Sequence, residues 1–128
     1  MVKVTETLVS PQFLLDSLRT DSSGSIVIHL GIVRPDSEGR SVSCIEYEME
    51  GNAAEKELLH IENEILSKWE IQDVALCRRT GRLNLGDLIL VAVISAPHRK
   101  EAFEACEFAV KQMRNMTSVK KREHFKED

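Results

Sequence analysis

The sequence lacks paired cysteines, metal-ligand clusters and long apolar runs. Its three cysteines, Cys44, Cys77 and Cys106, lie far apart and form no CxxC pair, which argues against a disulfide framework or a zinc site and favours a reducing compartment. The four histidines, at positions 29, 60, 98 and 124, show no metal-ligand spacing. No apolar segment approaches the length of a membrane span, and the first residues hold no apolar signal core. We therefore expect a soluble cytoplasmic protein without a metal site.

Common catalytic motifs are also absent. The chain has no P-loop, no GxGxxG after a strand, no HExxH and no GxSxG. Its formal net charge of -4 argues against a general nucleic-acid binder, because such domains are usually strongly basic. The bases are nevertheless concentrated between residues 78 and 126, while acids dominate the first 73 residues. This asymmetry indicates a local anion site.

The hydrophobic pattern predicts a single α+β domain over residues 1–128, since 42% of its residues are hydrophobic and no linker interrupts it. Alternating or β-branched segments predict strands at 2–8, 25–33, 42–49, 74–77 and 88–94. Helical spacing of apolar residues predicts a short helix at 11–18 and long helices at 53–69 and 98–116, the last with Phe103 on its inner face. Residues 34–41 and 78–87 are predicted loops. The polar, basic tail at 117–128 either packs against the body or is partly free.

Three groups of basic residues are candidates for anion binding. His98 and Arg99 follow a predicted strand at the start of a helix, where free backbone N–H groups attract phosphate. Arg34 follows another buried strand, and an arginine placed there can bind phosphate with two hydrogen bonds. The third group is Lys120-Lys121-Arg122, with Lys111 and Arg114 upstream. Taken singly, each group is more often a cap or a solvated surface.

Several motifs in sequence resemble the large, catalytic-type subunit of molybdopterin synthase. They are Gly31-x-Val33-Arg34, Gly39-x-x-Val42-x-x-Ile45-x-Tyr47-Glu48, Ala54-Glu-Lys56-x-Leu58, Gly81-x-Leu83-x-x-Gly86-Asp87, Ser95-Ala-Pro-His98-Arg99-x-x-Ala102-Phe103 and Lys121-Arg122-Glu123. The similarity runs in order from about residue 2 to residue 123. Agreement of several motifs is much stronger than a match to one.

The resemblance implies a fold, a reaction and partners. Members of the family have an α/β-hammerhead-type α+β fold with a mixed sheet, and they form a homodimer within a heterotetramer. Each binds a ubiquitin-like small subunit whose C-terminal Gly-Gly thiocarboxylate supplies sulfur to cyclic pyranopterin monophosphate, which yields the dithiolene of molybdopterin. No metal or organic cofactor takes part. By position, the catalytic residues are Lys121 and Arg114, and the substrate-binding residues are Ile32, Val33, Arg34, His98, Arg99, Arg114, Lys121, Arg122 and Glu123.

The sequence departs from the family pattern near its end. Lys111 stands where the pattern has an aspartate, Arg114 stands where it has an essential lysine, and Ser118-Val119-Lys120 replaces Pro-x-Trp before the final lysine. Arginine stays protonated, so it can hold an anion but cannot act as a neutral amine. Two alternatives therefore stand beside an active sulfurtransferase: a non-catalytic paralogue that binds a partner protein, and a small anion-binding module unrelated to pterins.

Overall fold

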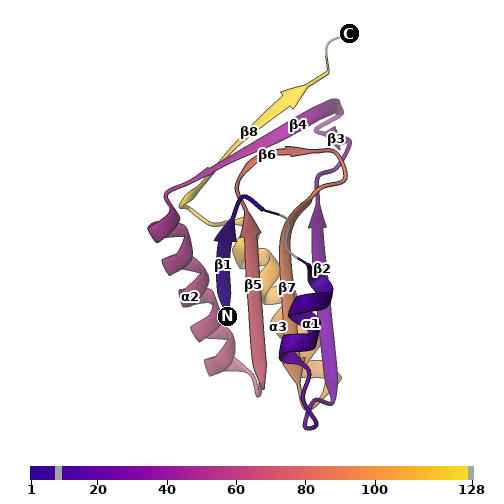
Figure 1. Ribbon diagram of the computed structural model, residues 1–128, viewed down its shortest axis with the longest axis vertical. Helices are drawn as coiled ribbons and strands as arrows, with labels where there is room; N and C mark the ends of the chain where they lie inside the picture. The colour runs from indigo at the N-terminus through magenta and orange to yellow at the C-terminus, as the bar shows by residue number, and fades with distance from the viewer. Residues whose placement is uncertain (8–9, 127–128) are drawn as a thin grey trace.

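The computed structural model describes residues 1–7 and 10–126, which fold into two sheets and three helices (Figure 1). This confirms the predicted α+β class and the two long helices. The helices are α1 (Pro11–Leu18), α2 (Gly51–Lys68) and α3 (Arg99–Arg114). The strands are β1 (Val2–Thr5), β2 (Ser25–Ile32), β3 (Asp36–Ser37), β4 (Arg40–Met49), β5 (Asp73–Arg79), β6 (Gly81–Asn84), β7 (Leu88–Ala96) and β8 (Val119–Phe125).

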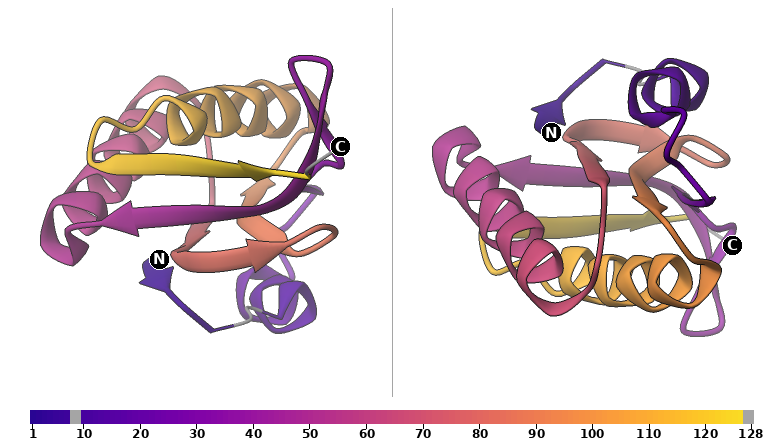
Figure 2. Two further views of the ribbon diagram at one scale, coloured as in Figure 1. Left: turned by 90° about the horizontal axis from the view of Figure 1, so that it is seen from above. Right: turned by 90° about the horizontal axis from the view of Figure 1, so that it is seen from below.

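The larger sheet has the order β1-β5-β7-β2 and forms the centre of the molecule. Strand β1 pairs with β5 in parallel, and the other neighbours are antiparallel. Helices α2 and α3 cover one face and α1 the other, as the two views of Figure 2 show. Strands β5 and β7 are buried on both faces, which explains their nearly continuous apolar runs.

The helices begin and pack largely as the sequence predicts. The Ser10 hydroxyl accepts a hydrogen bond from the Phe13 amide at 3.2 Å, and Pro11 occupies the first turn of α1. Helix α3 buries Ala102, Ala105, Cys106, Ala109 and Met113 against the larger sheet. The prediction for Phe103 is wrong, because its side chain is 61% exposed instead of being packed in the core.

The smaller sheet lies across one end of the larger sheet and is centred on β4 (Figures 1 and 2). Strands β3 and β6 pair with β4, and β8 pairs with β4 as well. The basic tail therefore packs against the body through strand β8. The loop predicted at 78–87 is wrong over Gly81–Asn84, because these residues form β6.

Two further features bear on function. None of the helices in the described residues is both long and apolar enough to cross a membrane. All three cysteines are free and buried. Burial raises the pKa of Cys106 to about 11 and also raises the pKa of Cys77.

Candidate functional site

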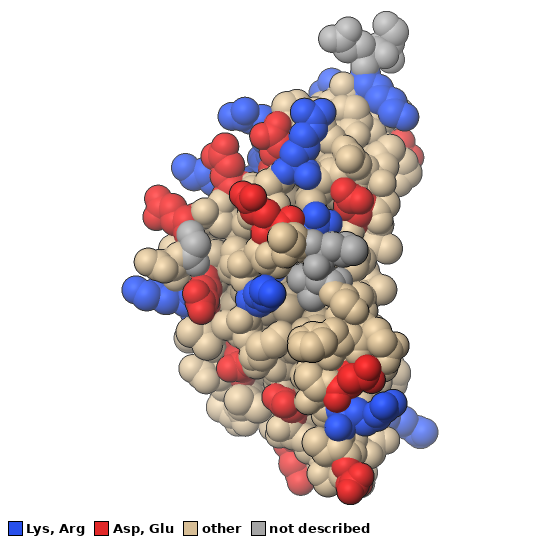
Figure 3. Space-filling model, viewed as in Figure 1, with Lys and Arg blue, Asp and Glu red and all other residues tan. Residues whose placement is uncertain are grey.

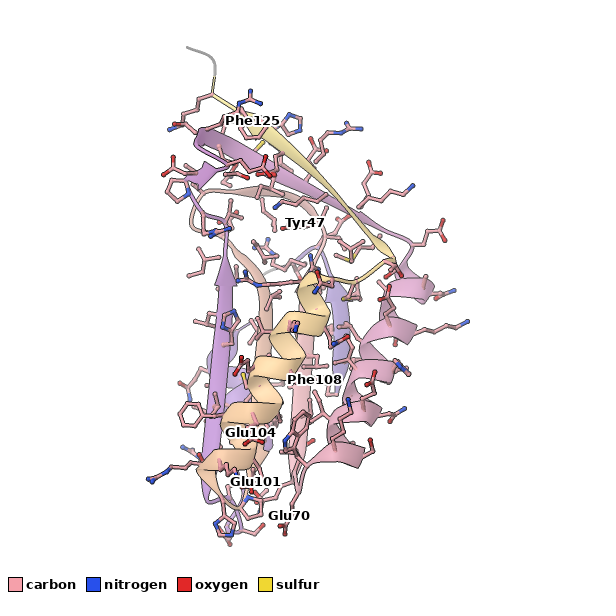
Figure 4. All side chains as sticks on the ribbon, turned by 180° about the vertical axis from the view of Figure 1, so that it is seen from behind. Tyr47, Glu70, Glu101, Glu104, Phe108 and Phe125 are labelled. Carbon is pink, nitrogen blue, oxygen red and sulfur yellow. The ribbon has the colours of Figure 1, made fainter. Side chains whose placement is uncertain are left out.

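A pocket of about 260 Å³ lies where the two sheets meet, at the C-terminal end of α3. Tyr47 marks it in Figure 4, between the smaller sheet and the end of that helix. The pocket is lined by residues of β2, β3, β4, β5, β7, α3 and β8 and of the segments that follow β2 and α3. Its lining consists of Gly31, Ile32, Arg34, Asp36, Ser37, Val42, Ile45, Tyr47, Arg78, Ile89, Leu90, Arg114, Met116, Val119, Lys121 and Glu123.

Five residues predicted from the sequence meet in this pocket although they come from distant parts of the chain. They are Ile32, Arg34, Arg114, Lys121 and Glu123. Arg34 follows the end of β2, Arg114 ends α3, and the last two belong to β8. Three cations thus converge from three separate elements on one small volume, which produces a positive potential that attracts anions.

Lys121 and Glu123 face the pocket together because side chains two apart on a strand share a face. Lys121 Nζ lies 3.7 Å from Glu123 Oε1. The Lys121 side chain remains 47% exposed, so its ammonium is accessible to a ligand. Arg122 lies between them in sequence and is not part of the lining, since alternation turns it to the other face of β8.

Not all of the residues that the sequence predicts for the site reach the pocket of their own chain. His98 and Arg99 stand at the start of α3, and α3 has 16 residues, so they lie about 24 Å from its C-terminal end. Figure 1 shows that α3 begins at the end of the molecule opposite the smaller sheet. Val33 is 2% exposed and packs in the core beside the pocket instead of lining it.

Arg78 and Tyr47 are two of the pocket residues that the sequence did not predict, and they lie next to each other. Arg78 is only 4% exposed at the end of β5, and its guanidinium carbon lies 5.0 Å from the centre of the Tyr47 ring. Arg78 Nη1 donates a 2.6 Å hydrogen bond to the Met113 carbonyl oxygen. Burial lowers the pKa of Arg78 most; Arg114 lowers it further, while Tyr47 and the more distant carboxylate of Glu57 raise it. An arginine nevertheless keeps its charge at neutral pH. Burial also raises the pKa of Tyr47, so its phenol stays neutral.

Glu57 on α2 holds the turn that leads into β8. Its carboxylate accepts hydrogen bonds from the Ser118 amide at 2.6 Å, the Thr117 amide at 3.2 Å and the Thr117 hydroxyl at 3.2 Å. Partial burial alone would raise the pKa of Glu57, but these hydrogen bonds bring it below its ordinary value. The carboxylate is therefore charged at neutral pH and fixes where β8 begins, two residues before Lys121.

A second, open groove of about 560 Å³ runs between β2 and α3 and shares Arg114 with the pocket. Phe103, Ile28 and Val110 give it an apolar surface, and His29 lies among them. His29 Nε2 is buried and has no hydrogen-bond partner within the described residues. Burial, followed by the charge of Arg114, lowers the pKa of His29, so the groove favours the neutral imidazole.

The chemistry of the pocket is that of anion binding. Its lining contains four cations, Arg34, Arg78, Arg114 and Lys121, against the two acids Asp36 and Glu123. Lys and Arg side chains are also numerous on the outer surface at this end of the molecule, interspersed with acids (Figure 3). Among residues 1–7 and 10–126, no three His, Cys, Asp or Glu side chains are placed to hold a metal ion. The arrangement suits an oxyanion such as a phosphate or a carboxylate.

Comparison with known proteins gives the pocket a family context. Residues 4–116 match the model of the family described as MoaE protein. The chain is 41% identical over 104 residues to a molybdopterin synthase catalytic subunit of Pyrococcus abyssi, covering 81% of this chain and 70% of that protein. A Bacillus subtilis protein of the same name is 31% identical over 121 residues, with coverages of 94% and 77%.

Solved structures agree with the sequence comparisons. A molybdopterin synthase from Staphylococcus aureus matches with a TM-score of 0.90 and 26% identity, over 98% of this chain and 91% of that chain. A Helicobacter pylori complex of subunits 1 and 2 of molybdopterin-converting factor matches with a TM-score of 0.77, and its 13% identity shows a shared fold only. The two sheets, the matched span and the relatives lead to one assignment: this chain belongs to the MoaE protein family.

Proposed function

We propose that this chain is the catalytic subunit of a molybdopterin synthase. In this role it transfers sulfur from the thiocarboxylated C-terminus of a ubiquitin-like small subunit to cyclic pyranopterin monophosphate, in the cytoplasm and without a metal or organic cofactor. The observation that carries the proposal is the meeting of Arg34, Arg114 and Lys121 in one pocket. Relatives that bear this enzyme's name support it.

The pocket charges match the demands of the reaction. The substrate phosphate and the incoming thiocarboxylate are both anions, and a carboxylate is released as sulfur leaves the small subunit. Fixed cations stabilise such charge without reorganising, and removing one preorganised donor typically costs a factor of 10² to 10³ in rate. Lys121 is half-exposed and can contact the reacting group, while Arg114 holds negative charge as a permanent cation.

A single-turnover assay tests the proposal. The unmodified chain is mixed with thiocarboxylated small subunit and cyclic pyranopterin monophosphate, and formation of the dithiolene product is followed. Product at the rate of a working sulfurtransferase is expected. Binding of the small subunit without any product would instead favour the non-catalytic paralogue, which the replacement of the family lysine by Arg114 keeps as the second candidate.

We further propose that the working unit is a homodimer joined through β2, with a small subunit bound to each chain. Strand β2 stands at the edge of the larger sheet and exposes Ile28, Leu30 and Ile32. Antiparallel pairing of two β2 strands would cover this apolar surface. The start of α3 lies near Ser25, because Ser25 pairs with Ala96. Antiparallel pairing would therefore bring the start of α3 in one chain toward the Ile32 end of β2 in the second chain. His98 and Arg99 of one copy would then complete the pocket of the other.

Light scattering on a charged edge-strand variant tests the dimer. We expect the unmodified chain to be a dimer at micromolar concentration and Leu30→Glu to be a monomer, because pairing would bury the added carboxylate. Leu66→Glu is the matched control, since Leu66 is similarly exposed, at 46% against 41%, but lies on α2. A monomeric unmodified chain, or a dimer that survives Leu30→Glu, contradicts the interface.

Substitution of Arg34 and Arg99 tests the composition of the pocket. Arg34→Ala and Arg99→Ala should each weaken substrate binding by about 1.5–3 kcal/mol, the range for hydrogen bonds to charged groups. Calorimetry with purified cyclic pyranopterin monophosphate measures this. Mixing the two variants should restore one intact site in each mixed dimer, because the surviving Arg34 and Arg99 then meet. Unchanged affinity in both single variants would remove these residues from the site.

A further inference from the structure

Arg78 is a buried cation whose surroundings do not account for its charge. It is 4% exposed, yet within the described residues no carboxylate lies within ion-pair distance of it. Its Nε is buried and has no hydrogen-bond partner. Burying an ion without a counter-ion costs several kcal/mol even after the protein relaxes. Some favourable interaction therefore has to offset this cost in the working protein.

Two contacts of Arg78 offset part of that cost. Nη1 donates to the carbonyl oxygen of Met113, one of the last four residues of α3, whose carbonyls have no partner within the helix. Tyr47 offers its ring to the guanidinium at 5.0 Å. A guanidinium has five N–H donors, and these contacts use one donor and one face. Arg78 is also one of the residues that line the pocket, where Arg114 and Lys121 add positive charge.

We infer that Arg78 binds the oxyanion that enters this pocket, as a rigid donor at its inner wall beneath the more exposed Arg34, Arg114 and Lys121. The inference rests on the proposed function for the source of the anion, which is the substrate phosphate or the carboxylate end of the small subunit. Arg78 is held by Met113 and Tyr47, so it gives direction to a ligand that flexible surface cations attract. An oxyanion in turn supplies the missing counter-charge.

The direct experiment observes the Arg78 side chain by NMR. Because its Nε–H is buried, its resonance should exchange slowly and be visible at neutral pH. Inorganic phosphate and acetate are titrated separately into the unmodified chain, so that the two possible sources of the anion are distinguished. A saturable shift of the Arg78 Nε resonance with either probe is expected. A resonance that stays fixed with both probes would overturn the inference.

Variants separate anion binding from a purely structural role. Arg78→Gln should weaken binding of the probe that shifts the resonance by about tenfold or more. Arg78→Lys keeps the charge but loses the planar guanidinium, so its affinity should lie between those of the unmodified chain and Arg78→Gln. Arg82→Gln makes the same change of charge at an exposed position of β6 outside the pocket and should leave binding within about twofold.

The outcomes are distinguishable. Arg78→Gln could lower the urea midpoint and leave the anion affinity unchanged. This result would show that Arg78 only caps the C-terminal end of α3, and it would overturn the inference. If Arg78→Gln does not fold, the Lys variant and the resonance of the unmodified chain still decide. Failure of the single-turnover assay in a chain whose Arg78 responds to phosphate would reject the proposed function but leave the anion site in place.

Discussion

We expect Lys121→Ala to lower the rate of sulfur transfer on the order of a thousandfold, while the chain stays folded. Lys121 is the lysine of β8 that faces the pocket, and removing a fixed donor that stabilises developing charge has effects of this size. Its side chain is 47% exposed, so truncation leaves no buried cavity. The pairing of residue 121 with Tyr47 uses the backbone and survives the substitution. Single-turnover conversion of cyclic pyranopterin monophosphate measures the loss.

Lys120→Ala is the matched control for this prediction. Lys120 precedes Lys121 on β8, is exposed, and lies outside the pocket lining. It should retain a rate close to that of the unmodified chain. Urea unfolding of both variants should give similar midpoints. Full activity in Lys121→Ala, or an equal loss in Lys120→Ala, would show that general positive charge on β8 matters and not the side chain in the pocket.

The second large effect is expected at Gly24, where two segments approach too closely for any side chain. A β-carbon at this position would overlap the carbonyl oxygen of Pro97 and lie 2.8 Å from its carbonyl carbon, and both are backbone atoms. The Gly24 amide also donates to the Ala96 carbonyl oxygen at 3.1 Å, which fixes the approach. We expect Gly24→Ala to lower the free energy of unfolding by about 3 kcal/mol, at the upper end of the cost of overpacking.

The same substitution should disturb His98 and Arg99, because they directly follow Pro97. Gly39→Ala is the control: Gly39 has a φ of 78°, but no atom lies within 4 Å of an added β-carbon. Its cost should be about 1 kcal/mol, from backbone conformation alone. Urea unfolding compares the two variants. Similar midpoints for both would mean that the segments move apart at little cost and that the contact does not position the start of α3.

The elements predicted from the sequence are those that are determined by residues within the element itself. The serine cap and proline that open α1 lie within the segment they control, and the apolar spacing of α2 and α3 lies within each helix. Strand β8 could not be recognised in this way, because VKKREHF is polar. It forms a strand because it pairs with β4, more than 70 residues earlier, and in this register Lys120 and Arg122 lie opposite Glu48 and Glu46. Strand β6 was missed for a similar reason, since Leu83 is its single buried residue.

The pocket residues likewise fall into those that the sequence predicted and those that it did not. Motif resemblance selected Arg34, Arg114, Lys121 and Glu123, and the fold brings these residues together. Arg78 gave no local signal, since it ends a buried strand beside a second arginine, and only the packing of α3 and β4 around it reveals an unpaired charge. His98 and Arg99 lie far from the pocket of their own chain. In the proposed dimer they would reach the pocket of the second chain, and such an interface leaves no local signal in the sequence.

The buried cysteines have a consequence for the selectivity of sulfur chemistry. A thiocarboxylate is an activated form of sulfur, and a cysteine thiolate that attacks its carbonyl carbon would form a thioester with the protein and release the sulfur as hydrosulfide. Cys44 is 2% exposed, Cys77 is 1% exposed, and the pKa of Cys106 is raised to about 11. At neutral pH almost none of the Cys106 thiol is ionised. The cysteines of the chain are therefore poorly placed to divert the sulfur atom of the donor before it reaches the substrate.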